Sequence, residues 1–130
     1  MLRLAATRRT SALARASALP TLRRSLATIT VCDDESQFDL AKKSESAVVY
    51  FTATWCGPCR MISTIFEEIA AAKSSSTFLK IDVDEMPEVA AAGRVSAMPT
   101  FQFYKQGELV DTIVGADIQK LNDSAEKHLS

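Results

Sequence analysis

One segment restricts the fold of this chain more than any other: residues 47–53 read AVVYFTA, apolar at odd and even positions alike. A strand with one face in water alternates apolar and polar side chains, whereas a strand covered on both faces does not need to. Residues 77–83, TFLKIDV, are expected to form a second central strand. The sequence therefore predicts a sheet with a layer of structure on each face.

Apolar residues at spacings of three and four predict helices between the strands. The helix expected at residues 59–73 buries one stripe, made of Met61, Ile62, Ile65, Phe66, Ile69 and Ala70. Another, capped by the acidic start at residues 33–35, is expected to reach Lys43. Two more are expected at residues 85–92 and at residues 117–129, the last with Ile118, Leu121 and Leu129 on its apolar face.

Three more strands complete the predicted sheet. Residues 29–31 form a short strand, and residues 100–115 form a hairpin that turns at Gln106 and Gly107. The order βαβαβαββα, with right-handed crossovers, gives an α/β fold in which a central mixed β-sheet is sandwiched between helices. Cys56 then lies between a central strand and a helix, at the edge where open α/β sheets carry their chemistry.

The composition fits a single domain, and the charge is unevenly distributed. The chain has 130 residues, of which 47% are hydrophobic and 24% charged. Six of the 15 basic residues are arginines within residues 1–30, which contain no acid, so residues 31–130 carry nine basic and 16 acidic side chains. Their net charge of -7 argues against nucleic acid or an anionic membrane as a partner.

The arginine-rich start predicts a targeting segment. Residues 1–26 mix arginine with Ala, Leu, Ser and Thr and lack the apolar core of a secretory signal, which is typical of a mitochondrial transit peptide cleaved after Leu26. The alternatives are a plastid transit peptide and a disordered basic tail. Residues 27–130 would then be the folded domain, in the mitochondrial matrix. No apolar run reaches 18 residues, so no membrane insertion is expected.

Two of the three cysteines, Cys56 and Cys59, flank Gly57 and Pro58. A structural disulfide is a weak interpretation, because closing a four-residue loop stabilises by about 2 kcal/mol, against about 5 kcal/mol for a hundred-residue loop. A zinc or iron–sulfur site lacks ligands, because structural zinc sites usually have two close pairs and only Cys32 and His128 remain. A cluster shared between two subunits stays open.

A reactive dithiol accounts for every residue of this segment. At a helix N-terminus, unpaired backbone N–H groups and the helix dipole stabilise a Cys56 thiolate. Pro58 is suited to the first helical turn, and Cys59 falls on the same helical face as Cys56. Cys56 is expected to be exposed enough to attack and Cys59 to lie deeper and resolve. Trp55 is either a core residue or a shield beside the attacking thiol.

The segments WCGPC at 55–59 and MPT at 98–100, with Gly115, resemble thioredoxin over residues 30–130. YFTATWCGPCR and VGADIQKL are most similar to the o-type mitochondrial thioredoxins of plants and green algae. The resemblance implies a thioredoxin fold and a protein-disulfide reductase that acts through Cys56 as nucleophile and Cys59 as resolving thiol. It implies no bound cofactor, a monomer, disulfide-containing target proteins, and re-reduction by an NADPH-dependent thioredoxin reductase.

The resemblance also implies a docking surface around the dithiol. It predicts a cis peptide between Met98 and Pro99, with the Met98 backbone pairing to the target like an added strand. Without it, Pro99 is an ordinary proline at the start of a strand and Gly115 carries no signal. The docking residues implied in this way are Trp55, Gly57, Pro58, Met98, Pro99 and Gly115.

Two positions depart from the family pattern. Tyr50 replaces a buried aspartate thought to help deprotonate the resolving cysteine, and Thr52 replaces a frequent tryptophan. Lys80 matches the lysine that accompanies the aspartate, or is an ordinary strand-end lysine that reaches water. An ordinary phenol, with a pKa near 10, is a poor general base at neutral pH, so Tyr50 is expected to act in packing. Cys32 is expected to be a small buried apolar residue.

Two other functions remain in view. A thioredoxin fold can be retained as a docking subunit, but such a scaffold does not need two paired thiols. A disulfide isomerase is disfavoured by the Gly57–Pro58 spacer and by a targeting segment that does not lead to the endoplasmic reticulum.

Overall fold

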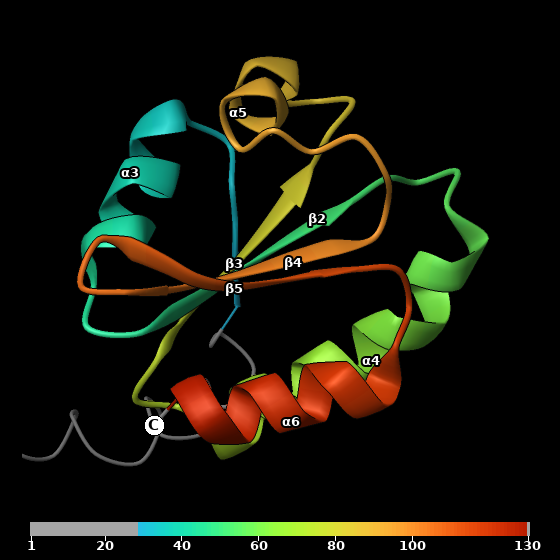
Figure 1. The fold of residues 1–130 in the computed structure, drawn as a ribbon. Coiled ribbons are helices and arrows are strands. Elements are labelled where there is room, and N and C mark those ends of the chain that lie inside the picture. The colour runs from blue at the N-terminus through green and yellow to red at the C-terminus, as the bar shows by residue number, and fades with distance from the viewer. Residues whose placement is uncertain (1–28, 130) are drawn as a thin grey trace, which may run out of the picture.

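The computed structural model describes residues 29–129 as one sheet with helices on both of its faces (Figure 1). The transit peptide expected at residues 1–26 lies outside the described residues. The predicted order of elements and the mixed sheet are confirmed. The elements are β1 (Ile29–Val31), α3 (Glu35–Lys43), β2 (Ala47–Thr52), α4 (Gly57–Ala72), β3 (Thr77–Asp82), α5 (Pro87–Ala92), β4 (Thr100–Lys105), β5 (Glu108–Val114) and α6 (Ile118–His128).

The strand order is β1-β3-β2-β4-β5, which puts β2 in the middle of the sheet. β1, β2 and β3 run parallel, and β4 and β5 add antiparallel pairs at the other side. All six residues of β2 are buried, as the pattern of residues 47–53 predicts. Gln106 and Gly107, the two residues between β4 and β5, both have positive φ, which two-residue type I′ hairpins require.

The side chains of β2 divide between two cores. Val48 and Tyr50 pack with Ile62, Phe66 and Leu121 on the face that α4 and α6 cover. The alternate residues Val49 and Phe51 pack on the other face with Phe38 of α3 and Val89 of α5. Figure 1 shows the two helix pairs on opposite sides of the sheet. Because helices cover both faces of the sheet, β2 needs apolar residues at odd and even positions alike.

The helices begin and end close to the predicted positions. Asp34 caps α3 by accepting from the backbone N–H of Ser36, and the Gln37 side chain completes a capping box. Two apolar positions were predicted wrongly: Met61 of α4 is 69% exposed and Ile118 at the start of α6 is 38% exposed. Both lie at the margin of an apolar stripe, where helical spacing does not separate buried positions from exposed ones. Within residues 29–129, no helix is long and apolar enough to cross a bilayer.

Candidate active site

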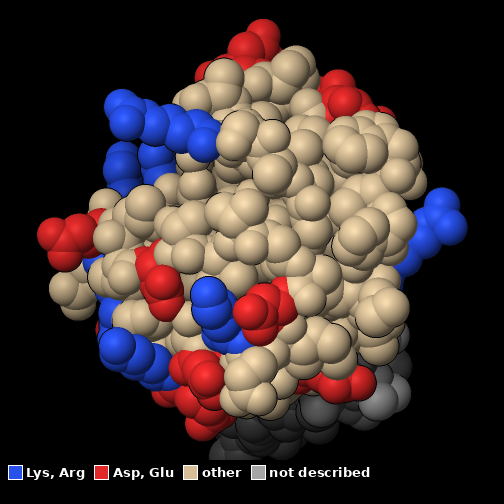
Figure 2. Space-filling view, turned by 45° about the vertical axis from the view of Figure 1, so that its right-hand side comes forward, with Lys and Arg blue, Asp and Glu red and all other residues tan. Residues whose placement is uncertain are grey.

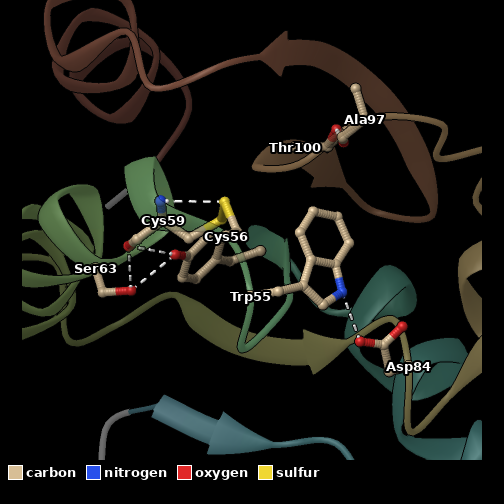
Figure 3. Close-up of a disulfide and its surroundings, with 8 residues drawn as sticks. Trp55, Cys56, Cys59, Ser63, Asp84, Ala97 and Thr100 are labelled. Atoms are coloured by element: carbon tan, nitrogen blue, oxygen red, sulfur yellow. Dashed lines mark hydrogen bonds between the residues drawn. A yellow bond between two sulfur atoms is a disulfide. The ribbon is translucent and has the colours of Figure 1, made fainter.

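Cys56 and Cys59 lie where β2 ends and α4 begins, and they form a disulfide (Figure 3). Cys56 is the N-cap of α4, and its sulfur accepts a hydrogen bond from the backbone N–H of Cys59 at 3.2 Å. Pro58 occupies the first turn, where a helix has no use for its missing N–H. The Cα atoms of the two cysteines are 5.3 Å apart, within the range that a disulfide spans.

The two cysteines do not differ in exposure as expected. Cys56 is 4% exposed and Cys59 is 2% exposed, and both pack in a small cluster with Ala53. The neighbouring residues Gly57 and Pro58 are exposed, so the surface opens beside Cys56. The disulfide therefore lies just below the surface at the N-terminus of α4.

Trp55 is an exposed residue of the site and not a core residue. It is 64% exposed, and its indole Nε1 donates to a carboxylate oxygen of Asp84 at 2.8 Å. Figure 3 shows the indole ring beside the cysteines, with Asp84 at its nitrogen edge. Because the hydrogen bond holds one edge of the ring, a large apolar surface stays next to the disulfide.

The loop before β4 faces the disulfide from the other side. The peptide bond between Met98 and Pro99 is cis, as predicted, and the half-buried Met98 packs against the cysteine cluster. The Gly115 amide donates to the Pro99 carbonyl at 2.8 Å, and the Thr100 hydroxyl donates to the Ala97 carbonyl at 2.6 Å. Gly115 has φ +103°, a conformation that other residues rarely adopt. The Gly115–Pro99 bond joins the two ends of the β4–β5 hairpin, and the Thr100–Ala97 bond closes the loop before β4.

Trp55 and Met98 therefore lie beside the disulfide, and Gly57 and Pro58 lie between the two cysteines in the chain. Figure 2 is turned toward the side on which α4 begins, and it shows a broad area free of Lys, Arg, Asp and Glu, with most charged side chains toward its margins. An uncharged surface on this side of the molecule suits contact with a protein target, since the centre of a protein interface is depleted in charge.

The phenol of Tyr50 lies against the back of the dithiol. Tyr50 is fully buried and stacks on Phe101 with ring centroids 4.7 Å apart, so it packs in the core as expected. Its hydroxyl donates to the Cys59 carbonyl oxygen at 3.0 Å and is 2.7 Å from the Ser63 hydroxyl. Ser63 also donates to the Cys59 carbonyl, at 2.8 Å. Sequence reasoning did not select Ser63, although its place four residues after Cys59 on the same helix was a usable signal.

A cavity of about 470 Å³ adjoins Cys59. Ser63, Arg60 and Lys80 are among the residues that line it. Lys80 is half-buried and is the partner of Tyr50 in the register of β2 and β3. The Lys80 side chain therefore lines the same cavity as the resolving cysteine.

Cys32 follows β1 directly and packs in a different core cluster from the dithiol. It is 5% exposed, and its thiol donates to the Asp34 carbonyl at 3.4 Å. Burial raises the pKa of the Cys32 thiol, an effect to which the nearby Asp33 and Asp34 add. Among residues 29–129, no group of three His, Cys, Asp or Glu side chains could hold a metal ion.

Comparison with known proteins agrees with this geometry. The family model for thioredoxin matches residues 27–127. Thioredoxin H4 of Arabidopsis thaliana is 50% identical over 94 residues, which cover 71% of this chain and 79% of that protein. The structure is similar to mitochondrial thioredoxin 3 of Saccharomyces cerevisiae, with a TM-score of 0.72 at 36% identity over 79% of this chain and 98% of that one. It is equally similar to thioredoxin O2 of Arabidopsis thaliana, with a TM-score of 0.72 at 36% identity over 78% of this chain and 94% of that one.

The expected resemblance is confirmed by sequence and by structure together. The chain belongs to the thioredoxin family, and its Cys56–Cys59 pair is the redox-active dithiol of a protein-disulfide reductase.

Proposed function

We propose that Cys56 is the attacking thiolate of this reductase and Cys59 the resolving thiol. The observation that carries the assignment is the N–H of Cys59, which points at the Cys56 sulfur from the first turn of α4. This donor and the helix N-terminus favour negative charge on Cys56. Cys59 has no equivalent place at the end of the helix.

The reaction then has two exchange steps. The Cys56 thiolate attacks one sulfur of a target disulfide; a new S–S bond forms, the target's S–S bond breaks, and the other target sulfur leaves as a thiolate. Cys59 loses its proton and attacks Cys56, which releases the second target sulfur and closes the Cys56–Cys59 disulfide. The target gains two electrons and two protons, and the dithiol loses them.

The target docks on the surface that surrounds the dithiol. Trp55, Gly57 and Pro58 form one side of this surface, and Met98, Pro99 and Gly115 form the other. The Met98 backbone pairs with an extended segment of the target, an arrangement in which main-chain bonds give affinity without requiring one target sequence. The exposed Trp55 ring and the uncharged area of Figure 2 support this assignment.

An NADPH-dependent thioredoxin reductase returns the pair to the dithiol form, and the protein acts as a monomer. We assign it to the mitochondrial matrix, with residues 1–26 as its transit peptide and residues 27–130 as the mature domain. The arginines of that segment and the similarity to a mitochondrial thioredoxin of yeast support this compartment over the plastid.

Insulin reduction tests the assignment. With NADPH and a thioredoxin reductase, the protein should precipitate the insulin chains and consume NADPH in proportion to the disulfides reduced. NADPH consumption without insulin reduction would show that the pair accepts electrons but does not pass them to proteins.

A further inference from the structure

The Cys59 carbonyl oxygen lies within hydrogen-bond distance of the hydroxyls of two side chains that come from different elements. Tyr50 reaches it from β2 at 3.0 Å, and Ser63 reaches it from the next turn of α4 at 2.8 Å. Serine often bonds to the carbonyl four residues earlier in a helix, so that contact alone would mean little. The Tyr50 contact is different because it ties the first turn of α4 to the central strand.

The two hydroxyls share three contacts but have only two protons. If Tyr50 donates to the carbonyl, Ser63 can donate to Tyr50 across their 2.7 Å contact; if Ser63 donates to the carbonyl, Tyr50 can donate to Ser63. One hydroxyl is enough to hold the carbonyl. The arrangement therefore contains a spare donor. We call the Tyr50 hydroxyl, the Ser63 hydroxyl and the Cys59 carbonyl together the carbonyl brace.

The brace and the dithiol meet in one residue. The carbonyl oxygen of Cys59 accepts a hydrogen bond within the brace, and the N–H of the same residue donates to the Cys56 sulfur at 3.2 Å. The carbonyl and the N–H of Cys59 belong to adjacent peptide planes in the first turn of α4, so bonds that fix the carbonyl limit the backbone rotation that would turn the N–H away from the sulfur. The donor that stabilises charge on the attacking sulfur thus depends on hydroxyls on the far side of Cys59.

We propose that Tyr50 and Ser63 are positioning residues of the dithiol, which hold Cys59 so that its N–H stays aimed at the Cys56 sulfur. This inference rests on the proposed role of Cys56 as the attacking thiolate. It gives Tyr50 a task other than proton transfer, in the place where related proteins have an acid. Because the brace has a spare donor, loss of one hydroxyl has a small effect and loss of both a larger one.

A double-mutant cycle tests the brace without any target protein or reductase. The rate at which iodoacetamide alkylates Cys56 in the reduced full chain is measured from pH 5 to pH 10 for wild type, Tyr50→Phe, Ser63→Ala and the double variant. At neutral pH each single change should lower the rate by about twofold and the double change by about tenfold, the upper range for one hydrogen bond. Above the pKa of the Cys56 thiol the four rates should converge.

Convergence of the four alkylation rates at high pH distinguishes a loss of Cys59 positioning from a general disturbance of the fold. Arg60 and Lys80, the cations that line the adjacent cavity, are unchanged in all four proteins, so their charge does not alter the comparison. A double-variant rate equal to the product of the single effects would overturn the proposal, as would a loss that persists at high pH. If Cys56 proves not to be the thiol that reacts, the proposed function fails instead, and mass spectrometry of the alkylated peptide shows which cysteine reacted.

Two matched comparisons complete the test. Thr64 is the exposed neighbour of Ser63, so Tyr50→Phe combined with Thr64→Ala should match Tyr50→Phe alone. If the alanine double variant does not fold, Tyr50→Phe is combined with Ser63→Val and, separately, with Ser63→Thr. Valine and threonine have nearly the same shape, so the faster reaction expected with threonine reports the hydroxyl itself; equal rates would contradict the brace.

Discussion

The indole Nε1 of Trp55 donates to Asp84 at 2.8 Å, although the ring itself is 64% exposed. An exposed tryptophan without such a bond would sample several rotamers. The hydrogen bond keeps the ring in one position beside the dithiol, ready for a target, so less side-chain entropy is lost when the target binds.

We therefore expect Asp84→Ala to weaken target binding more than chemistry. The KM for insulin should rise by about two- to fivefold with little change in kcat, because one hydrogen bond contributes about 0.5–1 kcal/mol. Asp84→Asn keeps an acceptor and should recover most of the affinity, and Glu88→Ala on the exposed start of α5 is the control. A fall in kcat at unchanged KM would mean that Trp55 acts in the exchange step and not in docking.

The cysteine variants separate the two exchange steps. Cys56→Ser should abolish insulin reduction, whereas Cys59→Ser should accumulate a mixed disulfide with the target, visible by mass spectrometry, because the attack proceeds and resolution does not. Cys32→Ser should leave turnover nearly unchanged, since burial raises the pKa of that thiol and it packs in a different core cluster from the dithiol. Full activity of Cys56→Ser would contradict the mechanism, and a large loss in Cys32→Ser would reveal a third redox thiol.

Much of the fold could be predicted from local patterns in the sequence. Residues 47–53 are apolar at odd and even positions alike because the two cores use alternate residues of β2, as a strand covered on both faces requires. The hairpin turn follows in the same way, because Gly107 supplies a backbone conformation with positive φ.

Features that depend on how elements lie against each other could not be predicted. Tyr50 and Ser63 are 13 residues apart, and only the packing of α4 on β2 brings their hydroxyls to one carbonyl. The indole of Trp55 likewise bonds to Asp84, 29 residues away. Neither the Tyr50–Ser63 contact nor the Trp55–Asp84 contact leaves a periodic pattern in the sequence.

A targeting test addresses residues 1–26. A protein that begins at Ala27 should fold and reduce insulin at the same rate as the full chain, because the described strands and helices begin at Ile29. It should also remain outside mitochondria when fused to a fluorescent protein, whereas residues 1–26 alone should direct the same reporter to the matrix. Import of the shortened protein would contradict the assignment of the transit peptide.

Tyr50→Phe distinguishes a general base from a structural group. Ser63 still donates to the Cys59 carbonyl in this variant, so turnover at neutral pH should stay within about threefold of wild type. General-base assistance is typically worth a hundredfold or more, which a phenylalanine could not supply. Single-turnover rates of mixed-disulfide resolution from pH 6 to pH 9 decide the question, and a hundredfold loss would show that the phenol transfers the proton.

Asp111 gives the fold an acid-dependent contact between β5 and α6. The Ser124 hydroxyl donates to its carboxylate at 2.6 Å, and this bond, with the Thr112 N–H and the nearby His128, lowers the pKa of Asp111 against the opposing effect of burial. A carboxyl whose pKa is lower in the folded state stabilises at pH values above its ordinary pKa, and this contribution is lost as the pH falls through the lowered value.

Asp111→Asn should therefore lower the free energy of unfolding at neutral pH by roughly 0.5–1 kcal/mol, a discounted figure because the side chain is 37% exposed and screened by water. The difference from wild type should shrink as the pH falls below about 4, where the wild-type carboxylate also becomes protonated. Urea unfolding from pH 2 to pH 7 measures it, with Glu108→Gln on the same strand as the control. A difference that stays constant across this range would mean that Asp111 contributes through shape and not through charge.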